Sequence, residues 1–164
     1  MCMPGSMLAL LRHPEVFDRL RRNPALAIPT VEEVLRYDPP VQFRTRTTLT
    51  DIPIAGVTIP RGAAVVLLLA AGSRDPARFA DPDRFWPERD DNEHFGFGGG
   101  DHLCVGAPLA RLEAVTALKA LARRLVAPRL VSDPPLSEKC RLARPGARAD
   151  RLRSSRRLRA ISHR

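Results

Sequence analysis

The chain has 164 residues, of which 44% are hydrophobic, and a formal net charge of +9. This length allows one domain with a modest core, and the longest apolar run, residues 63–71, is too short to span a bilayer. The three cysteines are scattered, which argues against a disulfide framework, and the N-terminus lacks the pattern of a signal peptide. The sequence therefore predicts a cytoplasmic protein without a membrane segment.

Helices are predicted first, over residues 8–23 with a break at Pro14, and again from Thr30 onward. Within the later helix, Glu33 and Arg36 are three positions apart, so their side chains share a face and can form an ion pair. An isolated Glu-x-x-Arg also fits a solvated surface pair, or a capping box in which Glu33 reaches back to the Thr30 N–H.

Short β-branched runs separated by Gly and Pro follow between residues 41 and 69, and they predict a small antiparallel sheet. Arg46 lies in the first of these runs, where an arginine is usually solvated but can also pair bidentately with a carboxylate. A short helix is expected next, with Asp75 as its N-cap and Pro76 at its first position.

Residues 95–106 set Cys104 between a glycine-rich loop and a helix. Glycines at 96, 98, 99 and 100 let the backbone approach a flat, bulky group without Cβ clashes. The helix is predicted to start just after Cys104, with Pro108 in its first turn, and unpaired N–H groups there favour a thiolate. Its expected apolar stripe is Leu109, Leu112, Val115, Leu118, Leu121 and Leu125.

Three interpretations of Cys104 follow from the residues themselves. A buried cysteine is common, although the flanking glycines argue against it. A zinc site would have only His94 and His102 as further local ligands, fewer than such a site needs. A cysteine-nucleophile hydrolase of the phosphatase kind would need five residues between cysteine and arginine, whereas six separate Cys104 from Arg111.

The stretch resembles the haem-binding loop of the cytochrome P-450 family. The family pattern Phe-x-x-Gly-x-x-x-Cys-x-Gly is met at Phe97, Gly100, Cys104 and Gly106, and the continuation Ala-Pro-Leu-Ala-Arg is typical of the soluble bacterial members. The resemblance implies haem b (iron protoporphyrin IX) as cofactor. It also implies that Cys104 is the proximal thiolate ligand of the iron.

Further roles are implied by the same resemblance. Phe97 would pack beside the ligand, and Gly100 and Gly106 would allow close approach of the porphyrin. His102 and Arg46 would bind the haem propionates.

The resemblance extends to the upstream Glu-x-x-Arg pair. In the family this helix is locked by a second arginine from a Pro-Glu-Arg segment, and Arg89 stands in that place here. Glu33, Arg36 and Arg89 are therefore expected to form a buried structural lock. Its implied task is to hold the segment 80–94 against the helices so that the Cys104 loop is rigid before haem binds.

The resemblance covers roughly residues 6–134, the last part of a family chain. It implies a mainly α fold with a small antiparallel β-sheet, the C-terminal haem-binding part of the cytochrome P-450 fold truncated at the N-terminus. The central helix, with the residues that deliver protons to oxygen, would lie upstream of Met1. The intact family inserts oxygen from O2 into a small organic substrate, using electrons from a ferredoxin or flavin-type donor.

Two domains are expected: a partial haem-binding domain over 1–134 and a basic tail over 135–164. The tail has ten Lys or Arg against two acidic residues, which gives it a net charge of +8. It could act as a basic interaction module, but it lacks aromatic residues for base stacking, so nucleic acid is not expected as a partner. A disordered, solvated tail is favoured, and a non-native ending, for example from a frameshift, is our hypothesis.

Overall fold

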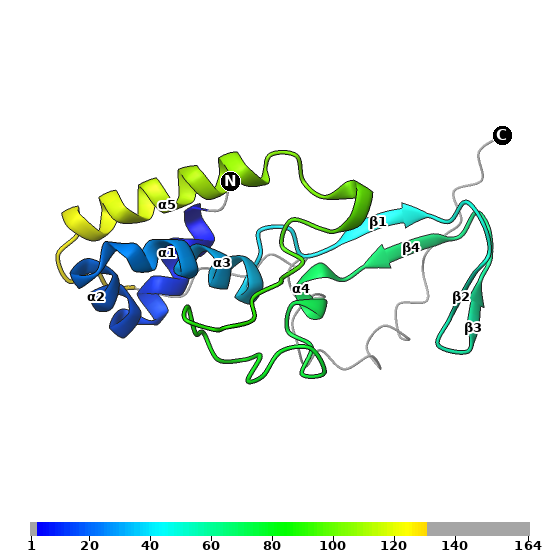
Figure 1. Cartoon of the computed structure of the whole chain (residues 1–164), viewed down its shortest axis with the longest axis horizontal. Helices are drawn as coiled ribbons and strands as arrows, with labels where there is room; N and C mark the ends of the chain where they lie inside the picture. The colour runs from blue at the N-terminus through cyan, green and yellow to red at the C-terminus, as the bar shows by residue number, and fades with distance from the viewer. Residues whose placement is uncertain (1–2, 131–164) are drawn as a thin grey trace.

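The computed structural model describes residues 3–130, which form a helical body with a β arm extending from it (Figure 1). The elements are α1 (Met3–Arg12), α2 (Pro14–Arg22), the 3-10 turn η1 (Pro24–Leu26), α3 (Ala27–Tyr37), β1 (Arg44–Thr47), β2 (Ile52–Ile54), β3 (Val57–Ile59), β4 (Ala64–Leu67), α4 (Leu69–Gly72), the 3-10 turn η2 (Gly100–His102) and α5 (Ala107–Arg124). The predicted mainly helical fold with a small antiparallel β part is confirmed. Among residues 3–130, no helix is long and apolar enough to cross a membrane.

The hydrophobic core lies between helices α1, α2, α3 and α5, with α5 placed along the other three (Figure 1). Leu10, Leu20 and Leu35 are at most 1% exposed, and Leu118 of α5 packs into the same cluster. Each buried leucine contributes about 1.5–3 kcal/mol through removal of apolar surface from water. The hydrophobic core of the described residues thus lies in the helical body, from which the β arm extends.

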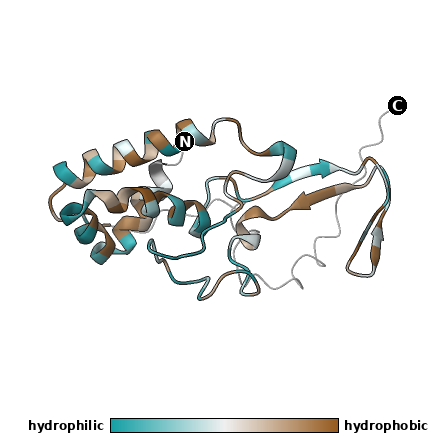
Figure 2. Ribbon diagram, in the orientation of Figure 1, coloured by the Kyte–Doolittle hydropathy of each residue, from teal (hydrophilic) through white to brown (hydrophobic). Residues whose placement is uncertain are grey.

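The β arm consists of two separate two-stranded antiparallel sheets, whereas one small sheet was expected. Strand β1 pairs with β4, and β2 pairs with β3 so that Ile52 lies opposite Ile59. Ala55 and Gly56 close the β2–β3 hairpin, both with positive φ, which is the conformation of a primed two-residue turn. Most residues of β2, β3 and β4 are exposed, and Figure 2 colours β4 and much of the β2–β3 hairpin as hydrophobic.

The prediction of a short helix that starts at Asp75 is wrong. Asp75 does act as a cap, because its carboxylate accepts the N–H of Ala77 at 2.9 Å and its carbonyl accepts the N–H of Phe79 at 2.9 Å. Only a single turn forms, and Asp81 then adopts a φ of 45°, which a right-handed helix cannot accommodate. The short helix in this region is α4, just upstream.

Helix α5 begins at Ala107, close to the predicted start, but its expected leucine stripe is only partly correct. Leu118 is buried, whereas Leu109 and Leu112 are 60% and 65% exposed. The buried face of α5 is made instead of Ala107, Ala114, Leu118 and Ala122. Small alanine side chains allow closely packed helices, and that face therefore lies on the core.

Candidate functional site

The cysteine loop, residues 95–106, joins the segment 80–94 to helix α5. The Cys104 N–H donates to the carbonyl of Phe97 at 3.0 Å, and the Cys104 carbonyl accepts the N–H of Ala107 at 3.1 Å. Cys104 is thereby held between the loop and the first turn of α5. Its side chain is exposed, so the interpretation as a buried structural cysteine is wrong.

Two kinds of glycine build this loop. Gly98 and Gly100 have φ values of 81° and 60°, a backbone conformation that side chains disfavour. Gly96 is needed for space, because a Cβ there would lie 2.7 Å from the carbonyl oxygen of Leu35 in α3. A Cβ added at Gly99 would meet nothing within 4 Å, so this part of the loop is open.

The predicted haem-contacting residues come from two places. Phe97, Gly100, His102, Cys104 and Gly106 all belong to the cysteine loop, where His102 is exposed in η2 and Gly106 is the N-cap of α5.

Phe97 is only partly exposed, because it packs against the hydrophobic core. Arg46 is exposed on β1, where its guanidinium donates to the Thr45 carbonyl at 2.9 Å. The structure thus groups the loop residues and leaves Arg46 on a separate element.

The three residues of the expected lock do meet. Arg36 donates from Nε to Glu33 Oε2 at 2.8 Å and from Nη2 to Glu33 Oε1 at 2.9 Å, and both side chains are fully buried. The Arg89 side chain is 4% exposed, and its Nε lies 3.4 Å from Glu33 Oε2. The capping-box alternative is wrong, because Glu33 is committed to these arginines and the Thr30 hydroxyl donates to the Leu26 carbonyl instead.

The buried cluster also holds the segment 80–94 by its backbone. Arg36 donates to the carbonyls of Ser73, Pro82 and Arg84 at 3.0, 2.9 and 3.1 Å. Glu33 accepts the N–H of Trp86 at 2.7 Å. A segment without regular secondary structure is thus fixed to α3 through buried charge-assisted hydrogen bonds.

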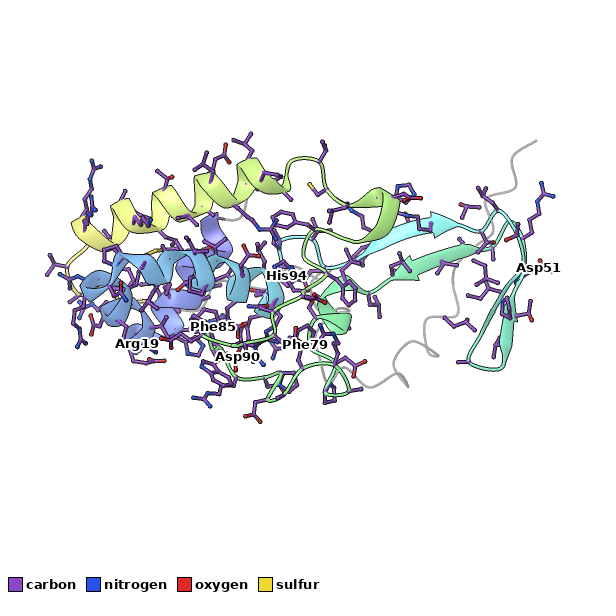
Figure 3. The ribbon with its side chains drawn as sticks, viewed as in Figure 1. Arg19, Asp51, Phe79, Phe85, Asp90 and His94 are labelled. Atoms are coloured by element: carbon purple, nitrogen blue, oxygen red, sulfur yellow. The ribbon has the colours of Figure 1, made fainter. Side chains whose placement is uncertain are left out.

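The same segment is attached at its surface by ion pairs. Arg19 of α2 pairs with Glu88, and Arg78 pairs with Asp91 and Glu93. Figure 3 labels Arg19 and Phe85 where α2 faces this segment, and Asp90 further along it. These contacts are solvent-exposed, so each contributes far less than the buried cluster.

A second cluster was not predicted. Glu32, next to Glu33 on α3, accepts two hydrogen bonds from Arg111 of α5, at 2.7 and 2.9 Å. Its Oε2 also lies 3.1 Å from His94 Nε2, and the His94 side chain is 3% exposed (Figure 3). The only sequence signal was the arginine at the end of Ala-Pro-Leu-Ala-Arg, whose partner lies 79 residues away.

The charge state of Glu32 follows from these contacts. Burial raises the pKa of its carboxyl, but the hydrogen bonds from His94 and Arg111, with the positive charge of Arg111, outweigh burial and lower the pKa from 4.5 to about 2. Glu32 is therefore ionised throughout the physiological range.

This lowered pKa predicts a pH-dependent stability. A carboxyl whose pKa falls on folding stabilises the native state above its unfolded pKa, and the contribution disappears as pH falls towards the folded value. We expect the Glu32→Gln variant to be less stable than the parent by ~1–2 kcal/mol above pH 5, and we expect this difference to shrink as pH falls from 4.5 towards 2. Urea denaturation at several pH values measures the difference, and a gap that does not change with pH contradicts the assignment.

Two alternative chemistries can be compared with this geometry. Within residues 3–130, no group of three or more His, Cys, Asp or Glu side chains is arranged to hold a metal ion. Arg111, the arginine that a phosphatase-like cradle would use, is paired with Glu32. The basic module proposed for residues 135–164 lies outside the described residues, as does the expected boundary between residues 134 and 135.

A mostly helical body that presents an exposed cysteine from a glycine-rich loop is the arrangement expected of the haem-thiolate class. Comparison with protein families agrees, because the family model described as Cytochrome P450 matches residues 5–140. The chain belongs to the cytochrome P450 family.

Named relatives come from several bacteria. The chain is 49% identical over 121 residues to the biotin biosynthesis cytochrome P450 of Bacillus subtilis (strain 168), covering 74% of this chain and 31% of that protein. It is 46% identical over 121 residues to the cytochrome P450 monooxygenase PikC of Streptomyces venezuelae, covering 73% and 29%. The chain thus spans about a third of the length of these relatives.

Solved structures give the same result. The crystal structure of P450BioI in complex with an acyl carrier protein ligated to hexadec-9Z-enoic acid matches with a TM-score of 0.78 and 45% identity, covering 80% of this chain and 35% of that chain. Mycobacterium smegmatis CYP164A2 in its ligand-free state matches with a TM-score of 0.78 and 46% identity, covering 81% and 34%.

The residues present fit one face of the haem that the family implies. Cys104 is an exposed residue whose sulfur suits iron, and no described atom would meet a Cβ at Gly99 or Gly100 within 4 Å. His102 and Arg46 are both exposed and carry N–H donors suited to propionates. These residues would offer a sulfur ligand to the iron and N–H donors to the propionates.

Proposed function

We propose that this chain supplies the thiolate side of the haem site of a monooxygenase that inserts oxygen from O2 into a small organic substrate. When bound, haem b with a thiolate ligand supplies the activation of oxygen. Cys104 would be that ligand. The single observation that carries the proposal is the exposed residue Cys104 within a loop that matches the family motif.

The other residues of the loop would orient the cofactor. His102 and Arg46 would donate to the propionates, and Phe97 would pack beside the ligand. Gly100 and Gly106 would leave room for the porphyrin. Without any cofactor, the positive φ at position 100 favours glycine there. At position 106 a Cβ would make only ordinary contact, at 3.8 Å from the Cys104 sulfur.

Glu33, Arg36 and Arg89 would act as the lock that makes the loop rigid before the cofactor arrives. Their burial and their hydrogen bonds to the segment 80–94 support this role. A ferredoxin or flavin-type protein would supply electrons, as in the family. The cytoplasmic location stays a prediction.

The test is a spectrum of the chain expressed with a haem supply. The ferrous carbon monoxide complex is expected to show the red-shifted Soret band of thiolate ligation, and the Cys104→Ser variant is expected to lose it completely, because a neutral hydroxyl donates much less electron density to iron. A red-shifted band that survives in Cys104→Ser would contradict the assignment of the ligand.

A further inference from the structure

The second cluster connects helix α3 to both ends of the cysteine loop. Glu32 and Glu33 are consecutive on α3, and a helix turns by about 100° per residue, so the two carboxylates face different neighbours. Glu33 binds the segment 80–94. Glu32 binds His94, just before the loop, and Arg111 of α5, five positions after the loop ends.

One connection runs through His94 to the start of the loop. The Gly96 N–H donates to His94 Nδ1 at 3.0 Å, so Nδ1 is the unprotonated ring nitrogen. The ring proton is therefore on Nε2, which donates to Glu32 Oε2 at 3.1 Å. Because the ring is 3% exposed, water competes little for either bond.

The other connection runs through Arg111 to the cysteine itself. The Arg111 guanidinium is paired bidentately with Glu32, and its central carbon lies 4.8 Å from the centre of the Phe97 ring. The Phe97 carbonyl in turn accepts the N–H of Cys104. The planar guanidinium thus covers the aromatic side chain whose backbone holds the cysteine.

We infer that Glu32 is a positioning residue for the Cys104 loop. Through His94 it fixes the backbone where the loop begins, and through Arg111 it fixes Phe97 and hence the hydrogen bond that holds Cys104. Its partners, His94 and Arg111, differ from those of the Glu33 cluster, which holds the same segment between Pro82 and Asn92. The inference rests on the proposed function only in taking Cys104 as the ligand whose position matters.

Amide hydrogen exchange tests the inference without any haem. In the Glu32→Ala variant of the full chain, protection at the Gly96 and Cys104 amides is expected to fall by tenfold or more. The Trp86 amide, which donates to Glu33, is expected to keep its protection. Amides in the middle of α5 report global unfolding and serve as the reference.

The matched control is Asp83→Ala, which also removes a carboxylate that is paired with an arginine, Arg74. It is expected to leave Gly96 and Cys104 as protected as in the parent. The inference is overturned if Glu32→Ala leaves both amides unchanged, if it alters them no more than Asp83→Ala does, or if all amides lose protection equally.

Separating the two connections sharpens the test. His94→Phe removes the acceptor of the Gly96 N–H and is expected to expose that amide more than Cys104. Arg111→Met leaves His94 bound to Glu32 and is expected to expose Cys104 more than Gly96. An identical pattern in both variants would overturn the two-connection arrangement.

A spectroscopic measurement links position to ligation. With haem bound, Glu32→Ala is expected to show a smaller share of the thiolate-type Soret band than Asp83→Ala, and equal shares would overturn the link to the ligand. If the parent chain takes up no haem, the proposed function fails in this chain, while the exchange results still decide the positioning role.

Discussion

The Arg36→Met variant is expected to be less stable than the parent by ~3–5 kcal/mol. The methionine fills much of the volume but leaves the fully buried Glu33 carboxylate without its bidentate partner. It also removes the Arg36 donor from the carbonyls of Ser73 and Pro82, and leaves the Arg84 carbonyl only its hydrogen bond from Arg89. Domains of this size are commonly stable by only about 5–15 kcal/mol, so the loss is a large part of the total.

Urea denaturation followed by the fluorescence of Trp86, the single tryptophan in the chain, measures this loss beside the cluster. Arg19→Met is the matched control, because Arg19 pairs with Glu88 of the same segment while almost half exposed. It is expected to lose under about 1 kcal/mol. If Arg36→Met does not fold, Arg36→Lys keeps the charge and should give an intermediate loss. Equal losses for Arg36→Met and Arg19→Met would show that burial of the cluster is unimportant.

The Gly96→Ala variant is expected to lose ~1–3 kcal/mol and to shift the cysteine loop away from α3. The added methyl would lie 2.7 Å from the Leu35 carbonyl oxygen and 3.0 Å from His94 Nδ1. Neither neighbour can yield easily, since one is helix backbone and the other belongs to a buried ring. The shift would also lengthen the hydrogen bond from the Gly96 N–H to His94.

Gly99→Ala provides the comparison for this substitution. Gly99 has an extended backbone, with a φ of −167°, and a Cβ there meets nothing within 4 Å. The stability of the Gly99→Ala variant is expected to stay within about 0.5 kcal/mol of that of the parent. Thermal or urea unfolding of both variants measures their stabilities. Similar stabilities would mean that Gly96 does not lie close against the Leu35 carbonyl of α3.

Local motifs predicted much of this architecture. The glycine loop, the cysteine and the start of α5 lie within one short segment, where spacing and capping rules apply directly. The meeting of Glu33 with Arg36 also follows from helix geometry, because the two are three positions apart. Placing Arg89 beside them needed the family resemblance, since Arg89 is 56 positions after Glu33 and the chain between them carries no local signal.

Contacts between segments far apart in the sequence could not be predicted from local motifs. Glu32, His94 and Arg111 are brought together only by the packing of α5 on α3, and no periodicity marks them as partners. The same packing explains the error in α5, where hydrophobicity alone favoured Leu109 and Leu112 over the alanines that face the core. Residue size, as well as apolarity, decided which face was buried.

Two neighbouring carboxylates on one turn of α3 thus anchor the segment 80–94 and helix α5, which precede and follow the cysteine loop. For protein engineering, this means that the cysteine segment is not a self-contained module. Transplanting it into another helical scaffold would require that single turn and its three arginine partners as well, because the loop's own residues specify its shape only in part.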